Sequence, residues 1–440
     1  MRMHPLALAA LLATVATAQA QTSASPTTAA LPEVKVTDGA DSAATEGSGQ
    51  YTAREVSVGK LVQSPRETPQ SISVITRQRL DDLNITKLED AVKQTTGVNI
   101  TRLDGAGNYN TIQSRGFDIG AIQLDGIAIP QGANFATALD TAIYDRIEVL
   151  RGPSGLLQGA SEPGGTINLV RKRARSPLGL SANLSAGSWD MRRADVDITG
   201  ALNATGSLRG RLVVVTDERH SFVDTLSNKK QAGYGTVELD INAATTLSVG
   251  HTRQRVRATI DQGLPAYADG RLLDVPRSTF AGLARNQQNL DTTDTFAELE
   301  HHLANGGLVK LAARQVQRDS FYSAARANSA VAATGNYQVQ TVDFLQDNTD
   351  RNYDLYLATP VQWLGRTHRV LLGMGHSQNS SLGGNFVYGP TSTANIFAPN
   401  YTAPYPTLTL PGYDSETRRT ENALYGQAQL SVTDRARVLL

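Results

Sequence analysis

The sequence predicts a membrane-spanning antiparallel β-barrel that follows a small mixed α/β domain. From about residue 178 onward, polar and apolar residues alternate with a period of two, and the connections between alternating segments are in turn short and long. Outer-membrane barrels combine this alternation with short periplasmic turns and long outer loops. Upstream, residues 54–174 hold short strand-like and helical patterns rich in glycine, which indicates a separate domain with tight turns.

The composition excludes several other classes of protein. The chain has 440 residues, with 41 Lys plus Arg against 41 Asp plus Glu, and no cysteine. This balance argues against a nucleic-acid partner, because binding nucleic acid needs a basic surface. The lack of cysteine excludes disulfides, thiolate metal sites and a cysteine nucleophile. The hydrophobic fraction of 40% is too high for a mostly disordered chain.

Residues 1–20 have the layout of a secretory signal peptide. Arg2 and His4 precede the apolar run 6–18, and Ala18-Gln19-Ala20 supplies small residues at the cleavage site. The run is too short for a stable spanning helix, which needs about 20 apolar residues. No polar face interrupts it, which disfavours the alternative of an amphipathic helix. We therefore expect the mature chain to leave the cytoplasm.

Residues 21–53 are dominated by Ser, Thr, Ala, Gly and Pro, a composition that predicts a flexible segment. One strand-like island interrupts it: Glu33, Val34, Lys35, Val36 and Thr37. Such an island on a tether suits pairing with the sheet edge of a partner protein. On these residues alone, a chance alternation within a linker is the better interpretation.

Residues 54–174 read as a compact α/β domain. We expect a strand at 71–76, a helix at 77–83 capped by Thr76, and a second helix that begins with a Thr86/Glu89 capping box and ends at Gly97. Further short strands are expected at 122–124 and 147–150. Two loops rich in Gly, Asn and Gln lie between them, at 104–110 and 130–136.

The sequence gives no positive sign of an enzyme. The glycine-rich run 151–155 lacks the Gly-Lys-Ser/Thr of a phosphate loop, and Leu156 replaces the glycine that a nucleophile elbow needs after Ser154. The seven histidines are scattered, and no His-Glu-x-x-His motif is present. We therefore predict no catalytic residues.

Residues 175–440 supply about ten strands and the beginning of another. Polar residues of each strand are expected to face the lumen, and Val, Leu, Ile and Ala the lipid. A secreted β-sandwich is the alternative, since it shows the same alternation. Short connections are expected near 203–206, 243–245, 305–307, 364–367 and 433–435, and long ones at about 217–231, 258–287, 324–349 and 379–418.

Several segments of residues 64–174 resemble, in the same order, the TonB-dependent outer-membrane receptors, specifically their ferric-siderophore branch. The closest resemblance is to ferric coprogen, ferrioxamine and ferripyoverdine receptors. The segments are Arg66-Glu-Thr-Pro-Gln-Ser-Ile-Ser-Val-Ile-Thr76, Ser114-Arg-Gly-Phe117, Leu124-Asp-Gly126, Ile147-Glu-Val-Leu-Arg-Gly-Pro-Ser-Gly-Leu-Leu157 and Glu162-Pro-Gly-Gly-Thr-Ile-Asn-Leu-Val170.

The resemblance implies a plug domain inside the lumen of a 22-stranded barrel in the outer membrane of a Gram-negative bacterium. It changes the interpretation of Glu33–Thr37 to a TonB box, which pairs with TonB and its inner-membrane energising complex. The implied activity is import of a ferric siderophore by plug remodelling. Iron arrives already chelated, so no cofactor or protein metal ligand is expected. Cobalamin, haem or a glycan as cargo, and a structural or adhesive barrel, are the alternatives.

The resemblance also implies site residues. Outward plug loops would contact the ligand through Arg102, Asn108, Tyr109, Gln131, Asn134 and Phe135, and the loop aromatics Trp189, Tyr267, Tyr322 and Tyr388 are weaker candidates. Arg102 serves equally well as half of a structural ion pair. Residues expected to lock the plug to the barrel are Arg115, Arg151 and Glu162.

The chain of 440 residues is too short for a plug domain together with a complete 22-stranded barrel. A plug of more than a hundred residues needs a wide lumen, whereas about ten strands enclose room only for side chains or one small ligand. Open barrel edges would also leave backbone groups unpaired in lipid. We therefore expect the chain to be the N-terminal part of a receptor, about half of the barrel included; the resemblance implies a total of roughly 700 residues.

Overall fold

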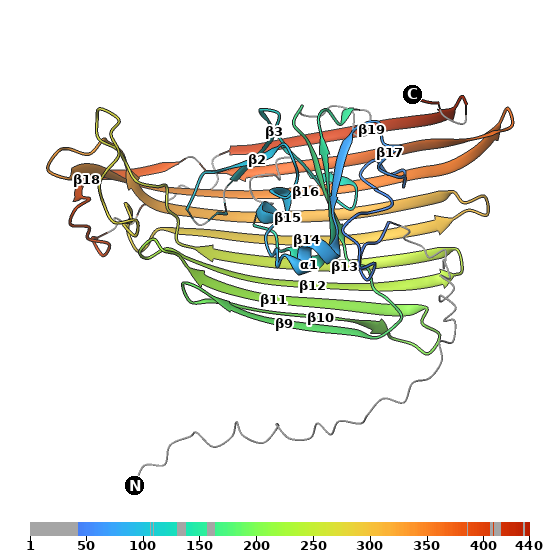
Figure 1. The fold of residues 1–440 in the computed structure, drawn as a ribbon, viewed down its shortest axis with the longest axis horizontal. Helices are drawn as coiled ribbons and strands as arrows, with labels where there is room; N and C mark the ends of the chain where they lie inside the picture. The colour runs from blue at the N-terminus through green and yellow to red at the C-terminus, as the bar shows by residue number, and fades with distance from the viewer. Residues whose placement is uncertain are drawn as a thin grey trace, which may run out of the picture. The chain divides into compact units, whose positions relative to one another are not determined.

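In the computed structural model, the described residues are 43–105, 107–108, 110–129, 138–155, 163–384, 386–404, 408, 415–433 and 436–440, which belong to one unit (Figure 1). The predicted signal peptide and the predicted TonB box, Glu33 to Thr37, lie outside the described residues. So do five of the candidate site residues: Tyr109, Gln131, Asn134, Phe135 and Glu162.

The plug contains two small sheets and short helices. Its main sheet has the order β1-β7-β8-β5-β6, in which β5 and β8 run parallel, and β2-β3-β4 form a second sheet. The elements are β1 (Ser71–Ile75), α1 (Arg77–Asp82), α2 (Leu88–Val92), β2 (Val98–Arg102), β3 (Asn110–Ser114), β4 (Phe117–Asp118), β5 (Ala121–Leu124), β6 (Ile127–Ile129), η1 (Thr141–Ile143), β7 (Tyr144–Arg151) and β8 (Gly165–Arg171).

The first predicted helix is confirmed, and the capping of the second is corrected. Thr76 caps α1, because its hydroxyl accepts from the Arg79 N–H. In α2 the N-cap is Lys87, which makes no side-chain capping bond, so the Thr86/Glu89 box does not form. Glu89 instead binds the cations Lys93 and Arg102, whose charges outweigh the capping interaction. Among the described residues, no helix is both long and apolar enough to cross a membrane.

The plug has an apolar core that continues onto the inner face of the large sheet, where Val213, Val215, Ala232, Tyr234, Phe296 and Val316 belong to the same cluster. Ile147 and Val149 of β7 pack with Ile167 and Leu169 of β8, and Leu80 of α1 is fully buried in the same cluster. Residues on both faces of β7 and β8 are buried, in contrast to the strands downstream. Hydrophobic burial therefore stabilises the plug and also contributes to its contact with the sheet.

The remaining strands form one large antiparallel sheet, and Figure 1 shows them side by side. Among the described residues, the path from β9 to β20 has eleven strands, and β18 pairs with β16 beside it as a twelfth, against a prediction of about ten strands and the beginning of another. The strands are β9 (Gly179–Gly187), β10 (Met191–Ala201), β11 (Leu208–His220), β12 (Ser227–Asn242), β13 (Thr245–Ala258), β14 (Gln287–His302), β15 (Leu308–Ala327), β16 (Asn336–Trp363), β17 (Arg366–Gly383), β18 (Val387–Asn395), β19 (Ser415–Ser431) and β20 (Arg437–Leu439).

The two faces of this sheet differ as the alternation predicts. Glu238 and Glu298 are buried on the face towards the plug, whereas Ile198, Leu212 and Val237 are 40–50% exposed on the other. This is the reverse of a water-soluble sheet, in which apolar side chains are the buried ones. It matches a membrane barrel, whose outer face contacts lipid, and excludes the β-sandwich alternative.

Several predicted long loops are instead strand. Loop 258–287 is confirmed between β13 and β14, but 217–231 reduces to the connection 221–226, and 324–349 to 328–335. In the last expected loop, 379–418, β17 continues to Gly383 and β18 forms. A barrel strand crosses a bilayer with about 9–11 residues, whereas β15 and β16 have 20 and 28. These strands therefore extend beyond the membrane at the loop end, where their polar residues pair across the ladder without contacting lipid.

Candidate ligand site and plug contacts

A run of four cations joins the plug to the first strand of the large sheet. Arg171 ends β8, and the next residues lead towards β9. Each cation binds different acids: Arg171 binds Asp125 and Glu298, Lys172 binds Asp197, Arg173 binds Glu238 and Glu300, and Arg175 binds Glu46. The run thus distributes its charge between the plug and the inner face of the sheet.

Asp125 is at the centre of the most deeply buried part of this interface. Arg171 and Arg314 each place a nitrogen 2.6 Å from its carboxylate, so it connects plug strand β8 with sheet strand β15. Both guanidinium groups also face the ring of Phe296, at 3.9 and 5.2 Å from its centroid. Burial alone would raise the pKa of Asp125, but the two arginines outweigh it and lower that pKa below its ordinary value.

Asp140 makes a second buried connection. It caps η1 by accepting from Ala142 N–H, and its carboxylate also binds Arg193 at 2.8 Å and Lys230 at 2.7 Å. Gln254 of β13 accepts from the Asp140 N–H and donates to the Ala138 carbonyl. Burial raises the pKa of Asp140, but Lys230 and Arg193 outweigh this effect and hold the pKa well below its ordinary value.

The segment before β1 is held at the short-turn end of the sheet. Lys60 binds Asp354 and the Tyr425 hydroxyl, each at 2.8 Å, with its ammonium 4.2 Å from the centroid of the Tyr425 ring. Glu67 binds Arg369 and Arg437 on β17 and β20.

Residues 43–53, which composition assigns to the flexible segment, are fastened too. The Thr45 and Glu46 N–H groups donate to Asp145, and Glu46 accepts from Arg211. These bonds form because Asp145 offers carboxylate oxygens to otherwise unpaired backbone donors.

The structure places the described candidates for the plug–barrel lock at other contacts. Arg151 donates to the Thr96 carbonyl and to Ser73 at 3.5 Å, both within the plug. Arg115 is exposed, with a φ of 55°, and its guanidinium lies beside Gly152. Neither shows a bond to the described sheet, so their role as a lock stays a prediction, as does that of Glu162. The ion pairs that join plug and sheet are instead those around Asp125 and Asp140.

The plug loop that follows β2 lies at the long-loop end of the sheet. Asp104 accepts from the Asn108 N–H at 3.0 Å, the Gly105 N–H donates to the Asp261 carbonyl beyond β13, and Asn108 accepts from Asn228 of β12. Gly105 has no room for a side chain, since a Cβ would lie 2.8 Å from the Asp261 carboxylate. The candidate Asn108 is therefore buried in a plug–sheet contact at the mouth.

Arg102 is held by Glu89. Its Nη2 lies 2.6 Å from the Glu89 carboxylate, which Lys93 also binds, while 54% of the Arg102 side chain stays exposed. Burial would raise the pKa of Glu89, but its bonds to Lys93 and Arg102 lower it. Arg102 thus forms a structural ion pair, which was one of its two expected roles. Ligand contact through the exposed part of the Arg102 side chain stays a prediction.

Aromatic side chains line the inner wall beside this plug loop. Tyr322 of β15 pairs in register with Phe344 of β16, on the face that carries Arg318 towards the plug. The Phe344 and Phe386 rings stack with centroids 4.4 Å apart, Phe386 and Tyr388 are 6.3 Å apart, and the Arg326 guanidinium lies 5.7 Å from the Tyr388 ring. We call Tyr322, Arg326, Phe344, Phe386 and Tyr388 the mouth cluster.

The loops around the mouth have a core of their own. Val331, Tyr337, Val339 and Ile396 are buried together, with Tyr267 packed against them. Asn286 bonds to both Ile260 and Ala325, which fixes loop 259–286 to β15. The candidate Tyr267 therefore has a packing role, and Trp189 packs edge-on against Phe222 at 6.1 Å. Of the four loop aromatics, Tyr322 and Tyr388 belong to the mouth cluster.

Sequence reasoning missed most of the charged interface and three of the five residues of the mouth cluster, Arg326, Phe344 and Phe386. The run Arg171-Lys172-Arg173 was a usable signal, because the sheet strands place Glu238, Glu298 and other acids at the positions expected to face the lumen. Phe344 and Phe386 offered no signal, since they come together only when β17 and β18 fold back beside β16. Among the described residues, no group of three or more His, Asp or Glu side chains is placed to hold a metal ion.

A plug whose charged surface fits the inner face of a lipid-facing sheet defines a plugged outer-membrane receptor. The comparisons with known proteins agree. Residues 64–166 match the family model described as TonB-dependent Receptor Plug Domain.

The relatives extend the similarity well beyond the plug. The ferric-pyoverdine M114 receptor of Pseudomonas sp. strain M114 is 36% identical over 374 residues, which are 83% of this chain and 45% of the relative. The ferric-pyoverdine 358 receptor of Pseudomonas putida is 31% identical over 90% of this chain and 50% of its own length. The chain thus spans about half the length of the curated relatives it matches.

Solved structures share the fold. The Pseudomonas aeruginosa ferripyoverdine receptor bound to ferripyoverdine superposes with a TM-score of 0.82 at 31% identity, covering 90% of this chain and 54% of that one. The Escherichia coli ferric-catecholate receptor Fiu has a TM-score of 0.78 at 20% identity, over 87% of this chain and 57% of its own, and supports the fold alone. The chain belongs to the TonB-dependent receptor family, which places it in the outer membrane of a Gram-negative bacterium.

Asp140→Asn should loosen the plug from the sheet. The amide keeps the shape of the carboxylate but removes the acid that pairs with Lys230 and the nearest acid of Arg193, which keeps Asp195 at 3.1 Å and Asp217 at 3.4 Å. Breaking a buried pair costs up to about 3–5 kcal/mol, and the remaining acids around Arg193 should reduce that cost. Hydrogen exchange should then speed up at η1 and at the plug face towards β10 and β12. Asp269→Asn, which removes an exposed pair with Arg271, is the control and should change little. Equal exchange in both variants would contradict the role of Asp140.

Acid should weaken the same contact. The pKa of Asp140 in the folded protein lies well below its ordinary value of 3.8. Its ion pairs therefore stabilise the fold fully above roughly pH 5, and that stability is lost as the pH falls towards the folded pKa. We expect plug amides at η1 to lose exchange protection on acidification in the wild type, and less steeply in Asp140→Asn, which has no carboxylate to protonate. Identical pH profiles would show that other groups control the contact.

Proposed function

We propose that this protein is a receptor that binds a ferric siderophore at the mouth cluster and imports it by TonB-driven remodelling of the plug. The observation that carries the proposal is the similarity across both plug and sheet to ferripyoverdine receptors, one of them solved with ferripyoverdine bound. A ferric pyoverdine is accordingly the first ligand to test. The proposed activity is transport, with no catalytic group assigned.

The mouth cluster has the chemistry for such a ligand. Phe386 and Tyr388 are about half exposed, so their faces are available to cover planar parts of an organic chelator. Arg326 adds a cation beside Tyr388, which favours an anionic chelate. The siderophore itself fills the coordination sphere of iron, so recognition needs no protein metal ligand. The ordered loop core around Tyr337 supports the proposal, because a preformed site loses less entropy on binding.

The contacts of the N-terminal segment suggest how force would enter the plug. Only a few residues separate the proposed TonB box at 33–37 from Thr45 and Glu46, which bind Asp145 and Arg211. A pull on the box would load these bonds first, and then Lys60 with Asp354 and Glu67 with Arg369. Each of these contacts weakens steeply with distance, so a small displacement breaks it, and the force then acts on the next contact along the chain.

The charged character of the interface supports movement of the plug against the sheet. Buried ions regain hydration when water enters, which repays part of the cost of separating them. The plug's own core is apolar and gains nothing from water. Force should therefore separate the ion pairs between plug and sheet at a lower cost than the apolar contacts of the cluster around Ile147 and Leu80, which includes sheet residues such as Val213 and Phe296.

Phe386→Ala should weaken binding of a ferric pyoverdine, because it removes the ring that contacts both Phe344 and Tyr388. We expect a tenfold loss of affinity, about 1.4 kcal/mol, measured by titration calorimetry. The control is Tyr353→Ala, which removes an exposed aromatic ring from the outer face of β16. Unchanged affinity in Phe386→Ala would remove the mouth cluster from the proposal, and failure of the wild type to bind any pyoverdine would refute this ligand class.

Val34→Pro should abolish uptake and leave binding intact. Proline removes a backbone donor and resists pairing as a strand, so the box could no longer add to a sheet of TonB. Growth on the iron chelate as sole iron source gives the readout, with Val34→Ile as the matched control that keeps strand propensity. Uptake by Val34→Pro at the wild-type rate would exclude the box. Uptake by the wild type in a strain without TonB would indicate a passive pore.

A further inference from the structure

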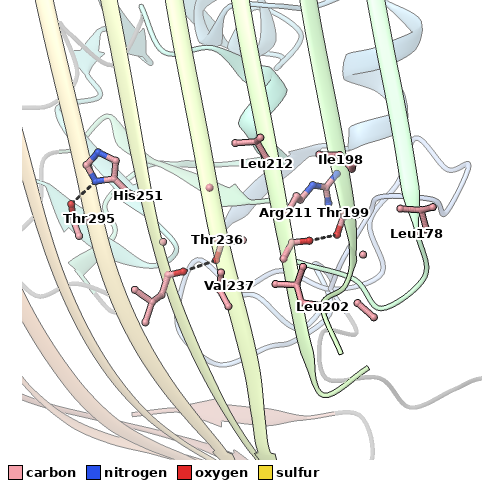
Figure 2. A pocket seen from close by; sticks show the side chains of 16 residues that line it. Leu178, Ile198, Thr199, Leu202, Arg211, Leu212, Thr236, Val237, His251 and Thr295 are labelled. Atoms are coloured by element: carbon pink, nitrogen blue, oxygen red, sulfur yellow. Dashed lines mark hydrogen bonds between the residues drawn. The ribbon is translucent and has the colours of Figure 1, made fainter. Parts of the chain in front are cut away.

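The outer face of the large sheet has a hollow of about 580 Å³ near its short-turn end. Figure 2 shows the labelled side chains around it, which come from β10 to β14 together with Leu178, just before β9. Most of its rim is apolar and exposed, with Leu178, Leu202, Leu212 and Val237. His251 and Thr295 at its β13–β14 side are hydrogen-bonded to each other at 2.8 Å. Polar groups of the floor are already paired, since Thr199 donates to the Gly210 carbonyl and Thr236 to the Val249 carbonyl.

Glycines create the hollow. Gly200 and Gly210 are cross-strand partners on β10 and β11, and Gly235 follows on β12. All three share the outward positions of Ile198, Leu212 and Val237 by strand alternation. None has a positive φ, and a Cβ on Gly235 would meet nothing closer than 4.0 Å. The backbone therefore does not require glycine at position 235, although glycine weakens a strand interior.

The position of the hollow identifies what fills it. It is continuous with the outer face on which Ile198, Val237 and Val249 are exposed, the face that a membrane barrel turns towards lipid. Leu202 adjoins the tight turn to Leu208, which lies at the periplasmic end of the sheet because periplasmic turns are the short ones. That end faces the inner leaflet of the outer membrane, which is made of phospholipid.

We propose that the hollow is a lipid site that holds one acyl chain of an inner-leaflet phospholipid. A smooth wall contacts acyl chains along one side only, whereas a chain seated over Gly200, Gly210 and Gly235 contacts floor and rim together. The added contacts make this chain slower to exchange than its neighbours. The hollow lies on the outer face of the sheet and is largely apolar, so it differs from the mouth cluster in both position and chemistry. The proposal depends on the location of the protein in the outer membrane and not on the ligand that the mouth cluster binds.

Gly235→Leu tests the proposal by filling the hollow with a side chain of the protein. The intact protein is purified from outer membranes in mild detergent, and retained phospholipid is counted by native mass spectrometry. The matched control is Gly233→Leu, which adds the same side chain on the same face of β12, outside the hollow, where a Cβ meets nothing within 4 Å. We expect wild type and Gly233→Leu to retain a phospholipid that Gly235→Leu loses.

A second measurement does not depend on purification. In vesicles of phosphatidylethanolamine with a spin-labelled acyl chain, the motionally restricted component of the spectrum should shrink in Gly235→Leu and not in Gly233→Leu. Heat-modifiable gel mobility confirms that each variant is folded. Equal lipid retention and equal restricted components in the three folded proteins would overturn the proposal, as would the same loss in both variants.

Discussion

The buried ion pairs between plug and sheet are the constraint on which the rest of this structure depends. Asp125, Asp140 and the run from Arg171 to Arg175 bring opposite charges together where water is largely excluded. Burying such a pair costs desolvation energy, and removing only one partner costs more because the other charge is left unpaired. These pairs therefore specify the position of the plug more than they add stability. They fix how the plug meets each strand, and hence which plug loop reaches the mouth.

The same interface explains how one chain combines a lipid-facing wall with a charged interior. Period-two alternation sends leucine and valine outward and carboxylates inward on the same strands, as in β12 and β14. The inward acids pair with cations of the plug, as Glu298 does with Arg171, and with cations of neighbouring strands, as Asp197 does with Arg211. The plug acids Asp125 and Asp140 in turn pair with cations of the sheet. A plug held by hydrophobic burial alone would be harder to separate by force, whereas the ion pairs beside the shared apolar cluster exchange protein partners for water.

The ends of the sheet differ in what they contribute. At the short-turn end, Glu46, Lys60 and Glu67 hold the segment through which force would enter the plug. At the loop end, strands longer than the membrane is thick carry Phe344 and Tyr322 past the bilayer to a position beside the plug loop. The proposed ligand site and the proposed energy input thus lie at opposite ends of the sheet, with Asp125 and Asp140 between them.

The sequence by itself determined the class of protein, because strand alternation, turn spacing and plug motifs are local and survive in a linear reading. It also identified β1, α1 and the approximate number of strands. Only the tertiary structure decided the partners of Arg171 and Asp140, the replacement of the Thr86 capping box by ion pairs of Glu89, and the stacking of Phe344 on Phe386. Charge pairing and ring stacking depend on distances across strands that lie far apart in the chain, and residue type alone does not encode those distances.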